Sequence, residues 1–428
     1  MTKHILIVTG SDYTPQVYDA FRRAQQAGHK LYLLSDGSFE PEAGVFAKHY
    51  TYDLRKTAEV LSYMKQQPER FDAVTIKTSE WLTPLVALLA RQYGCIGNEP
   101  VVAFRCRSKY HMRQKLEEYG VPIPPFRLCA SLEALQAAIK EIGLPCVAKP
   151  VGGNASYGTF LLQDARDLID LPRRYAASIA YLEQKAISED VFAFSPEELD
   201  LLGVTEHVDM VHDYLVEAFM PGPEISIDAL VQDGKVTMMG LAEQVRMAPP
   251  FFVQLAEFMP FRCTDETYVQ IEEIVRNTVE AMEIRNAPTH TELIFTPEGP
   301  KVVEIACRIG GDNIHDAVLQ TTGYNLMEEA IMIALGTPRS YNISARCHVA
   351  MRYLLPEKAG IIRNVIVPAV LRTDPDVTEI EITAQPGDTI APPPDSFDFL
   401  GYVQARGATR KEAVASLDRA LEAIIIEL

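Results

Sequence analysis

At 428 residues, with 47% hydrophobic and 23% charged residues, the chain is long enough for two or three globular domains with cores of their own. Its formal net charge of −18 argues against general binding to nucleic acid or to an anionic membrane. No uncharged apolar run approaches the ~20 residues that span a membrane, and the N-terminus lacks a signal-peptide cleavage pattern. Seven scattered cysteines without a C-x-x-C pair fit free thiols rather than disulfides or a zinc cluster, so we expect a cytoplasmic protein.

The first hundred residues alternate short apolar runs with helix-like spacing, which predicts a doubly wound α/β unit. Gly10 follows the first strand, but no complete G-x-G-x-x-G follows, so a tight turn is favoured over a nucleotide cradle. The predicted strands are residues 4–8, 31–34 and 71–76, with a further strand beginning at residues 95–96, and the predicted helices are residues 15–27 and 81–93.

The next stretch joins two lysines to a loop of small residues. Lys109 lies near the start of a predicted helix over residues 105–119, and Lys149 lies on a predicted strand over residues 145–150. The loop that follows, VGGNASYGTFLL, holds three glycines and leads into another apolar strand. Such a flap can close over phosphates with its backbone N–H groups, although its spacing is not that of a Walker A loop. The alternatives are a solvated lysine on a helix and a flexible hairpin turn.

Two acids mark the strands after this flap. Glu217 lies in the apolar run over residues 213–220, where its carboxylate and the neighbouring backbone suit the edge of an adenine ring. Glu224 follows a proline kink and could reach ribose hydroxyls. An Asp233-Gly234 turn then predicts a β-hairpin. The alternative for both acids is an ordinary surface strand.

Residues 244–262 hold an unusual cluster of aromatic residues and prolines, including PPFFVQLAEFMP. This cluster suits the wall of a small-molecule pocket, and buried core packing explains it almost as well. A helix is predicted over residues 267–282. His290 lies two residues before an acid on the next strand, so the two share a face, and it is either a substrate contact or a structural histidine.

The sequence TELIFTPEGPKVVEIACRIGGDN predicts a β-hairpin with one carboxylate on each arm, Glu292 and Glu304. Two like charges on one face of mainly apolar strands are costly unless a cation lies between them, and oxygen ligands in such a pair suit Mg²⁺. Arg308 follows, and Gly310 and Gly311 allow a close backbone approach. Together they indicate a site for Mg²⁺-bound phosphate. The alternative is an exposed hairpin whose acids face solvent.

The C-terminal part is predicted to be a small α+β closing module. A helix over residues 326–334 precedes several short strands from Cys347 onward, and a helix is predicted over residues 410–427. The predicted domains are residues 1–104, 105–218, 219–345 and 346–428.

These elements occur in the order used by the ATP-grasp ligases, and the resemblance is close over residues 105–315. Within that superfamily, the HTE and EIACRIGGD segments resemble the dipeptide-forming L-amino-acid ligases. The stretch GYVQARGATRKEA resembles the closing domain of that group and of ATP-grasp carboxylases. The resemblance implies an α/β and α+β multidomain chain: an ATP-grasp fold with a Rossmann-like N-terminal domain and a C-terminal α+β closing module.

The resemblance also implies residue roles. ATP phosphates would be met by Lys109, Lys149 and the loop holding Gly153, Ala155 and Ser156, adenine by Glu217, Ala218 and Phe219, and ribose by Glu224. Mg²⁺, as one or two ions with Mn²⁺ as an alternative, would be held by Glu292 and Glu304, and Arg308 would stabilise the transferring phosphoryl group. The predicted substrate contacts are Gln254, Glu257, His290, Arg308 and Gly311. The chain departs from many ATP-grasp enzymes at Ala306, where they carry an asparagine, and at Gln254, where relatives tend to carry an acid.

The implied reaction activates a carboxylate as an acyl phosphate, which the amine of an amino acid then attacks. His290 and Glu257 are the candidate general bases. The expected partners are the small-molecule carboxylate and the amino acid, with no nucleic acid and no membrane, and a homodimer would suit this architecture. The alternatives are another ATP-grasp outcome, such as a biotin-carboxylase-like or purine-pathway reaction, and a non-catalytic nucleotide-binding protein.

Overall fold

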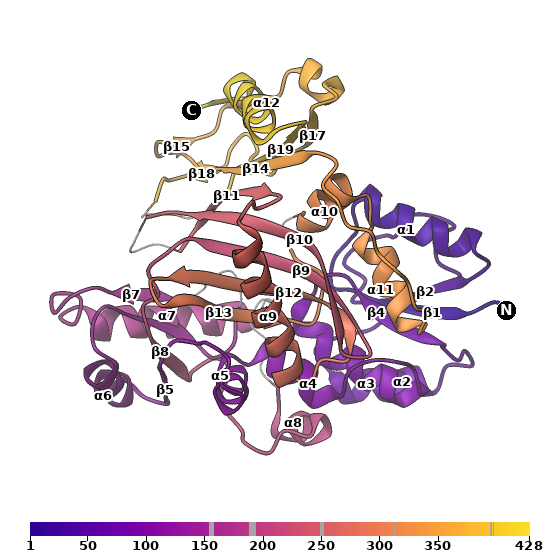
Figure 1. Ribbon diagram of the computed structural model, residues 1–428, viewed down its shortest axis with the longest axis horizontal. Coiled ribbons are helices and arrows are strands. Elements are labelled where there is room, and N and C mark those ends of the chain that lie inside the picture. The colour runs from indigo at the N-terminus through magenta and orange to yellow at the C-terminus, as the bar shows by residue number, and fades with distance from the viewer. Residues whose placement is uncertain (154–157, 188–193, 249–251, 312, 394–395, 397) are drawn as a thin grey trace.

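The N-terminal unit contains a four-stranded parallel sheet with the strand order β3-β2-β1-β4 (Figure 1). The predicted parallel sheet is therefore confirmed. The strand predicted at residues 95–96 is wrong, because the N–H of Cys95 bonds to the carbonyl of Ala90 and closes the end of a helix instead. The elements are β1 (His4–Val8), α1 (Pro15–Gln26), β2 (Lys30–Ser35), β3 (Lys48–Thr51), α2 (Thr57–Lys65), β4 (Ala73–Ile76), the 3₁₀ turn η1 (Glu80–Leu82) and α3 (Thr83–Tyr93).

Two helices, α4 (Pro100–Arg107) and α5 (Lys109–Glu118), take the place of the single helix predicted over residues 105–119. Ser108 separates them because its backbone is extended, with φ −99° and ψ 107°. The break frees the N–H of Lys109, which donates to the carbonyl of Val151 at 3.0 Å. Lys109 thus begins a helix directly beside the glycine loop.

A second, antiparallel sheet with the order β5-β8-β6-β7 carries the glycine loop between β6 and β7. The computed structural model describes residues 1–153, 158–187, 194–248, 252–311, 313–393, 396 and 398–428. The elements of this part are β5 (Phe126–Cys129), α6 (Leu132–Ile142), β6 (Cys146–Pro150), β7 (Phe160–Leu162), α7 (Leu171–Ile187), α8 (Pro196–Leu202) and β8 (Tyr214–Ala218).

An eight-stranded antiparallel sheet forms the centre of the molecule, with the order β13-β12-β9-β10-β11-β14-β19-β17 (Figure 1). The predicted turn between β9 and β10 is confirmed, since Asp233 and Gly234 have positive φ angles of 51° and 79°, as a tight hairpin turn requires. The elements are β9 (Glu224–Gln232), β10 (Lys235–Arg246), β11 (Gln254–Met259), α9 (Asp265–Ala281), β12 (Asn286–Thr296), β13 (Gly299–Ala306), α10 (Ile314–Thr322) and α11 (Leu326–Ala334).

The C-terminal part adds three strands to that sheet and packs a helix over them (Figure 1). The predicted terminal helix ends at Ala423 rather than residue 427, because Ile424 has an extended backbone and the next three residues pair as a strand with β16. The elements are β14 (His348–Leu354), β15 (Gly360–Ile361), β16 (Asn364–Ile366), η2 (Ala369–Thr373), β17 (Val377–Ile382), β18 (Thr389–Ile390), β19 (Gly401–Gly407), α12 (Arg410–Ala423) and β20 (Ile425–Glu427).

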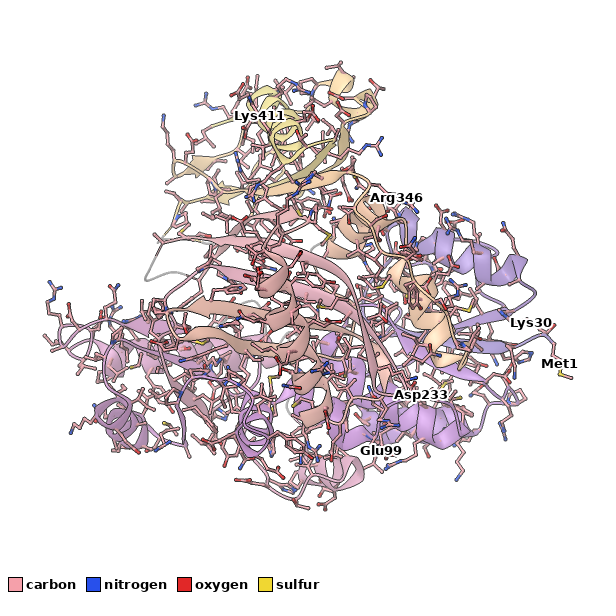
Figure 2. The ribbon with its side chains drawn as sticks, in the orientation of Figure 1. Met1, Lys30, Glu99, Asp233, Arg346 and Lys411 are labelled. Carbon is pink, nitrogen blue, oxygen red and sulfur yellow. The ribbon has the colours of Figure 1, made fainter. Side chains whose placement is uncertain are left out.

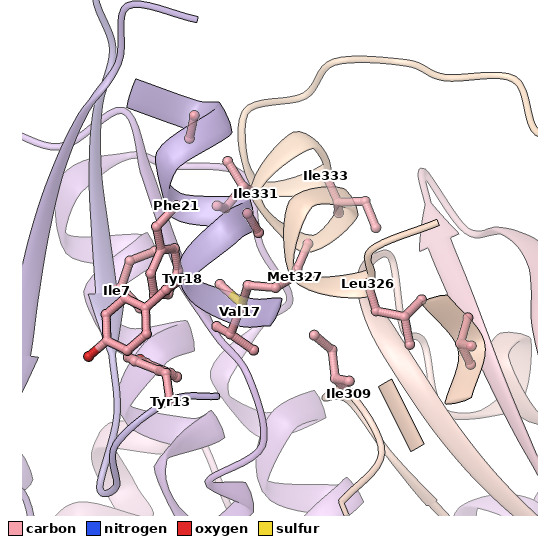
Figure 3. Close-up of a cluster of buried hydrophobic side chains, with 14 of the residues drawn as sticks. Ile7, Tyr13, Val17, Tyr18, Phe21, Ile309, Leu326, Met327, Ile331 and Ile333 are labelled. Atoms are coloured by element: carbon pink, nitrogen blue, oxygen red, sulfur yellow. The ribbon is translucent and has the colours of Figure 1, made fainter. Parts of the chain in front are cut away.

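The N-terminal unit is joined to the rest by a continuous apolar core. Figure 2 shows Met1 at the outer end of this unit and Lys411 on α12, which packs over the β14 and β19 end of the central sheet. In Figure 3, Val17 of α1 lies beside Met327 of α11 while Phe21 points toward Ile7 of β1, and all four side chains are buried. Apolar burial of this extent fixes the parallel sheet against the central one. Among the described residues, none of the helices is both long enough and apolar enough to cross a membrane.

Candidate active site

The hairpin of β12 and β13 places Glu292 directly opposite Glu304, and the register shifts immediately after Glu292. The facing pair expected from the sequence is thus present. Both side chains are partly open to solvent, with exposed fractions of 16% and 28%. Directly opposed like charges destabilise a strand pair unless cations offset them.

Three cations offset these two carboxylates. Arg246 reaches Glu292 with an Nη2–Oε2 distance of 3.6 Å, and Lys109 reaches Glu304 with an Nζ–Oε2 distance of 3.8 Å. The third is His290, whose Nε2 lies 3.7 Å from Oε1 of Glu292. Residues from β10, α5 and β12 therefore converge on one short stretch of the hairpin.

His290 is buried and held by a second acid on β9. Its Nδ1 lies 3.2 Å from Oδ2 of Asp228, and the other oxygen of Asp228 accepts the N–H of Gly310 at 3.0 Å. Burial lowers the pKa of His290, but Asp228 and Glu292 outweigh it and raise the pKa to about 10. A ring that is protonated at neutral pH cannot accept a proton, which disfavours His290 as the general base.

Arg246 also pairs with Glu224, the acid predicted to meet ribose. Its Nε donates to Oε2 of Glu224 at 2.5 Å, and its Nη2 bonds to the other oxygen. Burial raises the pKa of Glu224 to about 7, against the opposing effect of Arg246. On the next strand Gln254 pairs in register with Arg246, and its amide donates to Glu257 at 3.3 Å. Gln254 therefore lies beside this arginine, and Glu257 is linked to it through Gln254.

Glu217 is buried between two cations. Arg113 Nε and Lys149 Nζ each lie 2.7 Å from its carboxylate oxygens. The N–H groups of Ala218 and Phe219 are also engaged, by the carbonyls of Pro125 and Pro145. The adenine contact expected at residues 217–219 stays a prediction. Adenine could bind there through backbone carbonyl oxygens, or by displacing Arg113 or Lys149 from Glu217.

The first part of the glycine loop contacts Lys109, the first residue of α5. The carbonyl of Gly153 accepts hydrogen bonds from Lys109 Nζ at 2.8 Å and from Arg107 at 3.5 Å. Gly153 has a φ of +87°, a conformation that favours glycine. The predicted phosphate contacts Ala155 and Ser156 lie outside the described residues.

Arg308 is buried and tied to the N-terminal unit through an acid that sequence reasoning missed. Its Nη2 and Nε lie 2.6 and 3.2 Å from Oε2 of Glu80, whose other oxygen lies 3.5 Å from Arg107. Burial would raise the pKa of Glu80, but the two arginines hold it below its ordinary value. Next in the chain, a side chain at Gly310 would clash with Asp228 and His290, whereas one at Gly311 would meet nothing within 4 Å.

The residues that sequence reasoning missed are the partners of those it found. One of them left a signal, since Glu224 and Asp228 alternate with Ile225 and Ile227 and so share a face of one strand. The others come from distant elements and left none. The missed residues are Glu80, Arg107, Arg113, Asp228 and Arg246.

Comparison with known proteins shows which proteins this chain resembles. Residues 197–316 match the ATP-grasp domain, and residues 352–428 match the L-amino acid ligase C-terminal domain 2. The crystal structure of an L-amino acid ligase from Bacillus licheniformis superimposes with a TM-score of 0.80 at 21% identity, covering 100% of this chain and 98% of that one. The chain thus has the fold of the ATP-grasp proteins, which use ATP with Mg²⁺.

The chain is also similar in sequence to curated proteins, among them an L-amino acid ligase. An uncharacterized protein, y4rH of Sinorhizobium fredii, is 26% identical over 79% of this chain, which spans 65% of that relative's length. The L-arginine-specific L-amino acid ligase of Bacillus subtilis is 22% identical over 77% of this chain and 73% of its own length. The chain is therefore similar to the L-amino acid ligases in its fold, in its ATP-grasp domain and in its C-terminal domain.

Proposed function

We propose that this ligase joins two amino acids, or a related carboxylate and an amino acid, through an acyl phosphate, and releases ADP and phosphate. The observation that carries the proposal is the facing pair Glu292 and Glu304, with Lys109 and Arg246 within 4 Å and the charge of Arg308 acting on both acids. Phosphoryl transfer demands positioning and charge neutralisation more than covalent help from the protein, and this arrangement supplies both.

The hairpin fits Mg²⁺ with Glu292 and Glu304 as its protein ligands. Among the described residues, no group of three or more histidine, cysteine, aspartate or glutamate side chains is arranged to hold a metal. Two carboxylates suffice for Mg²⁺, which usually takes its remaining ligands from phosphate and water. When bound, the ion would neutralise charge on the nucleotide phosphates.

The cations around the hairpin can then serve the phosphates. Lys109 begins its helix beside the glycine loop, and Lys149 lies at the end of the strand that leads into it. Arg308 follows the hairpin, two residues before Gly310, and acts electrostatically on both acids, so it can steady the transferring group and the activated carboxylate. Closure of the glycine loop would exclude water, which would otherwise hydrolyse the acyl phosphate.

The attacking amine must lose a proton, and Glu257 is the better candidate to take it. It is a buried carboxylate on β11, where its neighbour Gln254 faces Arg246. His290 instead acts as a fixed cation that orients Glu292 and Asp228.

Affinity for ATP should depend on the charge of Lys149. Burial lowers the pKa of Lys149 to about 8, although Glu217 opposes the shift, so the ammonium is charged below this pH and neutral above it. We expect kcat/KM for ATP to fall as the pH rises through about 8, because a cation that meets phosphate is lost. Arginine stays protonated at these pH values, so Lys149→Arg should flatten that limb of the profile. Superimposable alkaline limbs in the two proteins would exclude this role.

The test of the proposed function is phosphate release from Mg-ATP across a matrix of amino acids, supplied alone and in pairs. Mass spectrometry of each positive mixture shows whether an amide has formed. Phosphate release restricted to certain pairs, with the matching dipeptide mass, would establish the reaction and name its substrates. ATP binding with no turnover for any pair, extended to non-proteinogenic carboxylates, would refute it.

A further inference from the structure

The cations of the candidate site already have carboxylate partners within the protein, and one lysine at its edge does not. Among the residues that the structure describes, no ion pair or hydrogen bond is formed by the ammonium of Lys77, which is only partly exposed. The paired cations are Lys109 with Glu304, Lys149 and Arg113 with Glu217, Arg246 with Glu224 and Glu292, and Arg107 and Arg308 with Glu80.

Lys77 lies where the topology of the parallel sheet predicts a ligand. It directly follows β4, at the carboxyl end of the strand. The strand order β3-β2-β1-β4 reverses direction between β1 and β4, and ligands of doubly wound sheets bind at the carboxyl ends of strands where the order reverses. Gly10 marks the same end of β1, and its N–H donates to Ser79 Oγ at 3.2 Å.

Lys77 also lies beside the segment from Arg308 to Gly310, which follows β13. The carbonyl of Lys77 accepts the N–H of Ile309 at 3.0 Å, so its backbone lies directly beside Arg308 and Gly310. Three residues further on, Glu80 holds Arg308 itself. An amino acid bound against this turn would therefore lie beside the backbone from which the Lys77 side chain extends.

The surroundings keep the Lys77 ammonium charged without neutralising it. Burial lowers the pKa of Lys77 to about 8, while Glu379 and Asp316 act in the opposite direction from β17 and α10. Both acids are engaged elsewhere: Asp316 accepts from Gln320, and Glu379 accepts from an asparagine amide at the start of α10. A partly buried cation without a direct partner is a receptor for an anion.

We propose that Lys77 binds the free carboxylate of the amino acid that supplies the attacking amine. This inference rests on the proposed ligase function, and it identifies the residue that binds the acceptor amino acid. The acyl donor loses its carboxylate charge to the phosphoryl group beside Arg308, whereas the acceptor keeps its carboxylate, two bonds from the amine, throughout the reaction. Because Asp316 and Glu379 lie close by, the acceptor class is amino acids with neutral or basic side chains.

The test compares an acceptor amino acid with its own amide, which keeps the nucleophilic amine and lacks the carboxylate. For the substrate pair found in the matrix, Lys77→Met should raise KM for the acceptor about 10- to 100-fold, the usual worth of a charged hydrogen bond. It should change kcat/KM for the amide less than about threefold. Lys77→Arg should retain part of the preference for the carboxylate, and Lys411→Met, an exposed lysine on α12 (Figure 2), should behave as wild type.

The outcomes separate the inference from the proposed function. An equal loss with the amino acid and its amide, or an increase in KM for ATP or the acyl donor instead, would overturn the role of Lys77 while leaving the ligase intact. Efficient use of aspartate or glutamate as acceptor would overturn the stated acceptor class. Failure of the wild-type protein to form a dipeptide from any pair would overturn the proposed function and this inference with it. The thermal melting temperature and Mg-ATP affinity of Lys77→Met should match wild type, and a loss of both would place Lys77 in the structure rather than at the acceptor.

Discussion

Glu304→Gln is expected to lower kcat about 100- to 1,000-fold while the protein stays folded. A bound metal supplies several kcal/mol of charge stabilisation to phosphoryl transfer, and each 1.36 kcal/mol corresponds to a factor of ten in rate. Glutamine keeps the length and shape of the side chain but removes the charge that would hold the ion. The Glu304 side chain is 28% exposed, so an amide can be accommodated without a buried penalty.

The matched control for this variant lies in the turn of the same hairpin. Glu298 is exposed, accepts a hydrogen bond from Thr296 and, within the part of the chain that the structure describes, forms its ion pair with Lys301 rather than with a cation of the site. Glu298→Gln should therefore keep wild-type kcat. The measurement is kcat as a function of Mg²⁺ concentration, with circular dichroism to verify folding. Wild-type turnover by Glu304→Gln would remove this residue from the metal site.

Arg113→Met is expected to lower the free energy of unfolding by about 3 kcal/mol, because breaking a buried ion pair leaves its partner uncompensated. The Arg113 side chain is fully buried and joins three elements. It donates to Glu217 on β8 at 2.7 Å and to the carbonyl of Val303 on β13 at 2.7 Å. Methionine fills the space of the stem but leaves Glu217 with Lys149 alone.

Urea denaturation of Arg113→Met and of a surface control measures this loss. Arg127 pairs with Glu141 on the exterior, where solvent screens the interaction, so Arg127→Met should leave the unfolding midpoint unchanged. Equal midpoints for Arg113→Met and wild type would mean that the buried triad contributes no net stability. A weaker affinity for ATP is also expected, since Lys149 and Glu217 lose a neighbour that fixes their positions.

Local patterns predicted the elements whose partners are close in sequence. The β12–β13 hairpin follows from alternation and a short turn, and the Asp233-Gly234 turn follows from its residue types. The pairing of Glu292 with Glu304 also needs the register shift after Glu292, because the unshifted register would set Glu292 against Val303. The family resemblance predicted the fold as a whole. The errors lie where a distant segment decides the local structure: Val151 takes the N–H of Lys109 and favours a break before that residue. At the other end of the chain, strand β16 draws the last residues out of the terminal helix.

The ion-pair partners of the candidate site could not be predicted in this way. Arg246 lies on β10 and reaches Glu292 through the order of strands in the central sheet. Glu80 lies after β4 and reaches Arg308 because the N-terminal unit packs against that sheet. No sequence spacing encodes such a contact. The assigned roles of the site residues, and the domain boundaries, stay predictions that the experiments above can test.

Inorganic phosphate and metal-free ATP meet a site whose cations already have counter-ions. To bind either, Lys109 has to leave Glu304 and Arg246 has to leave Glu292, and both carboxylates then remain beside the incoming negative charge. A divalent ion that arrives with the nucleotide removes this repulsion, since the carboxylates can turn to the metal while the cations turn to the phosphates. If the proposed function holds, the free protein would therefore discriminate against the bare anions that compete for a phosphate site, before any substrate has been selected.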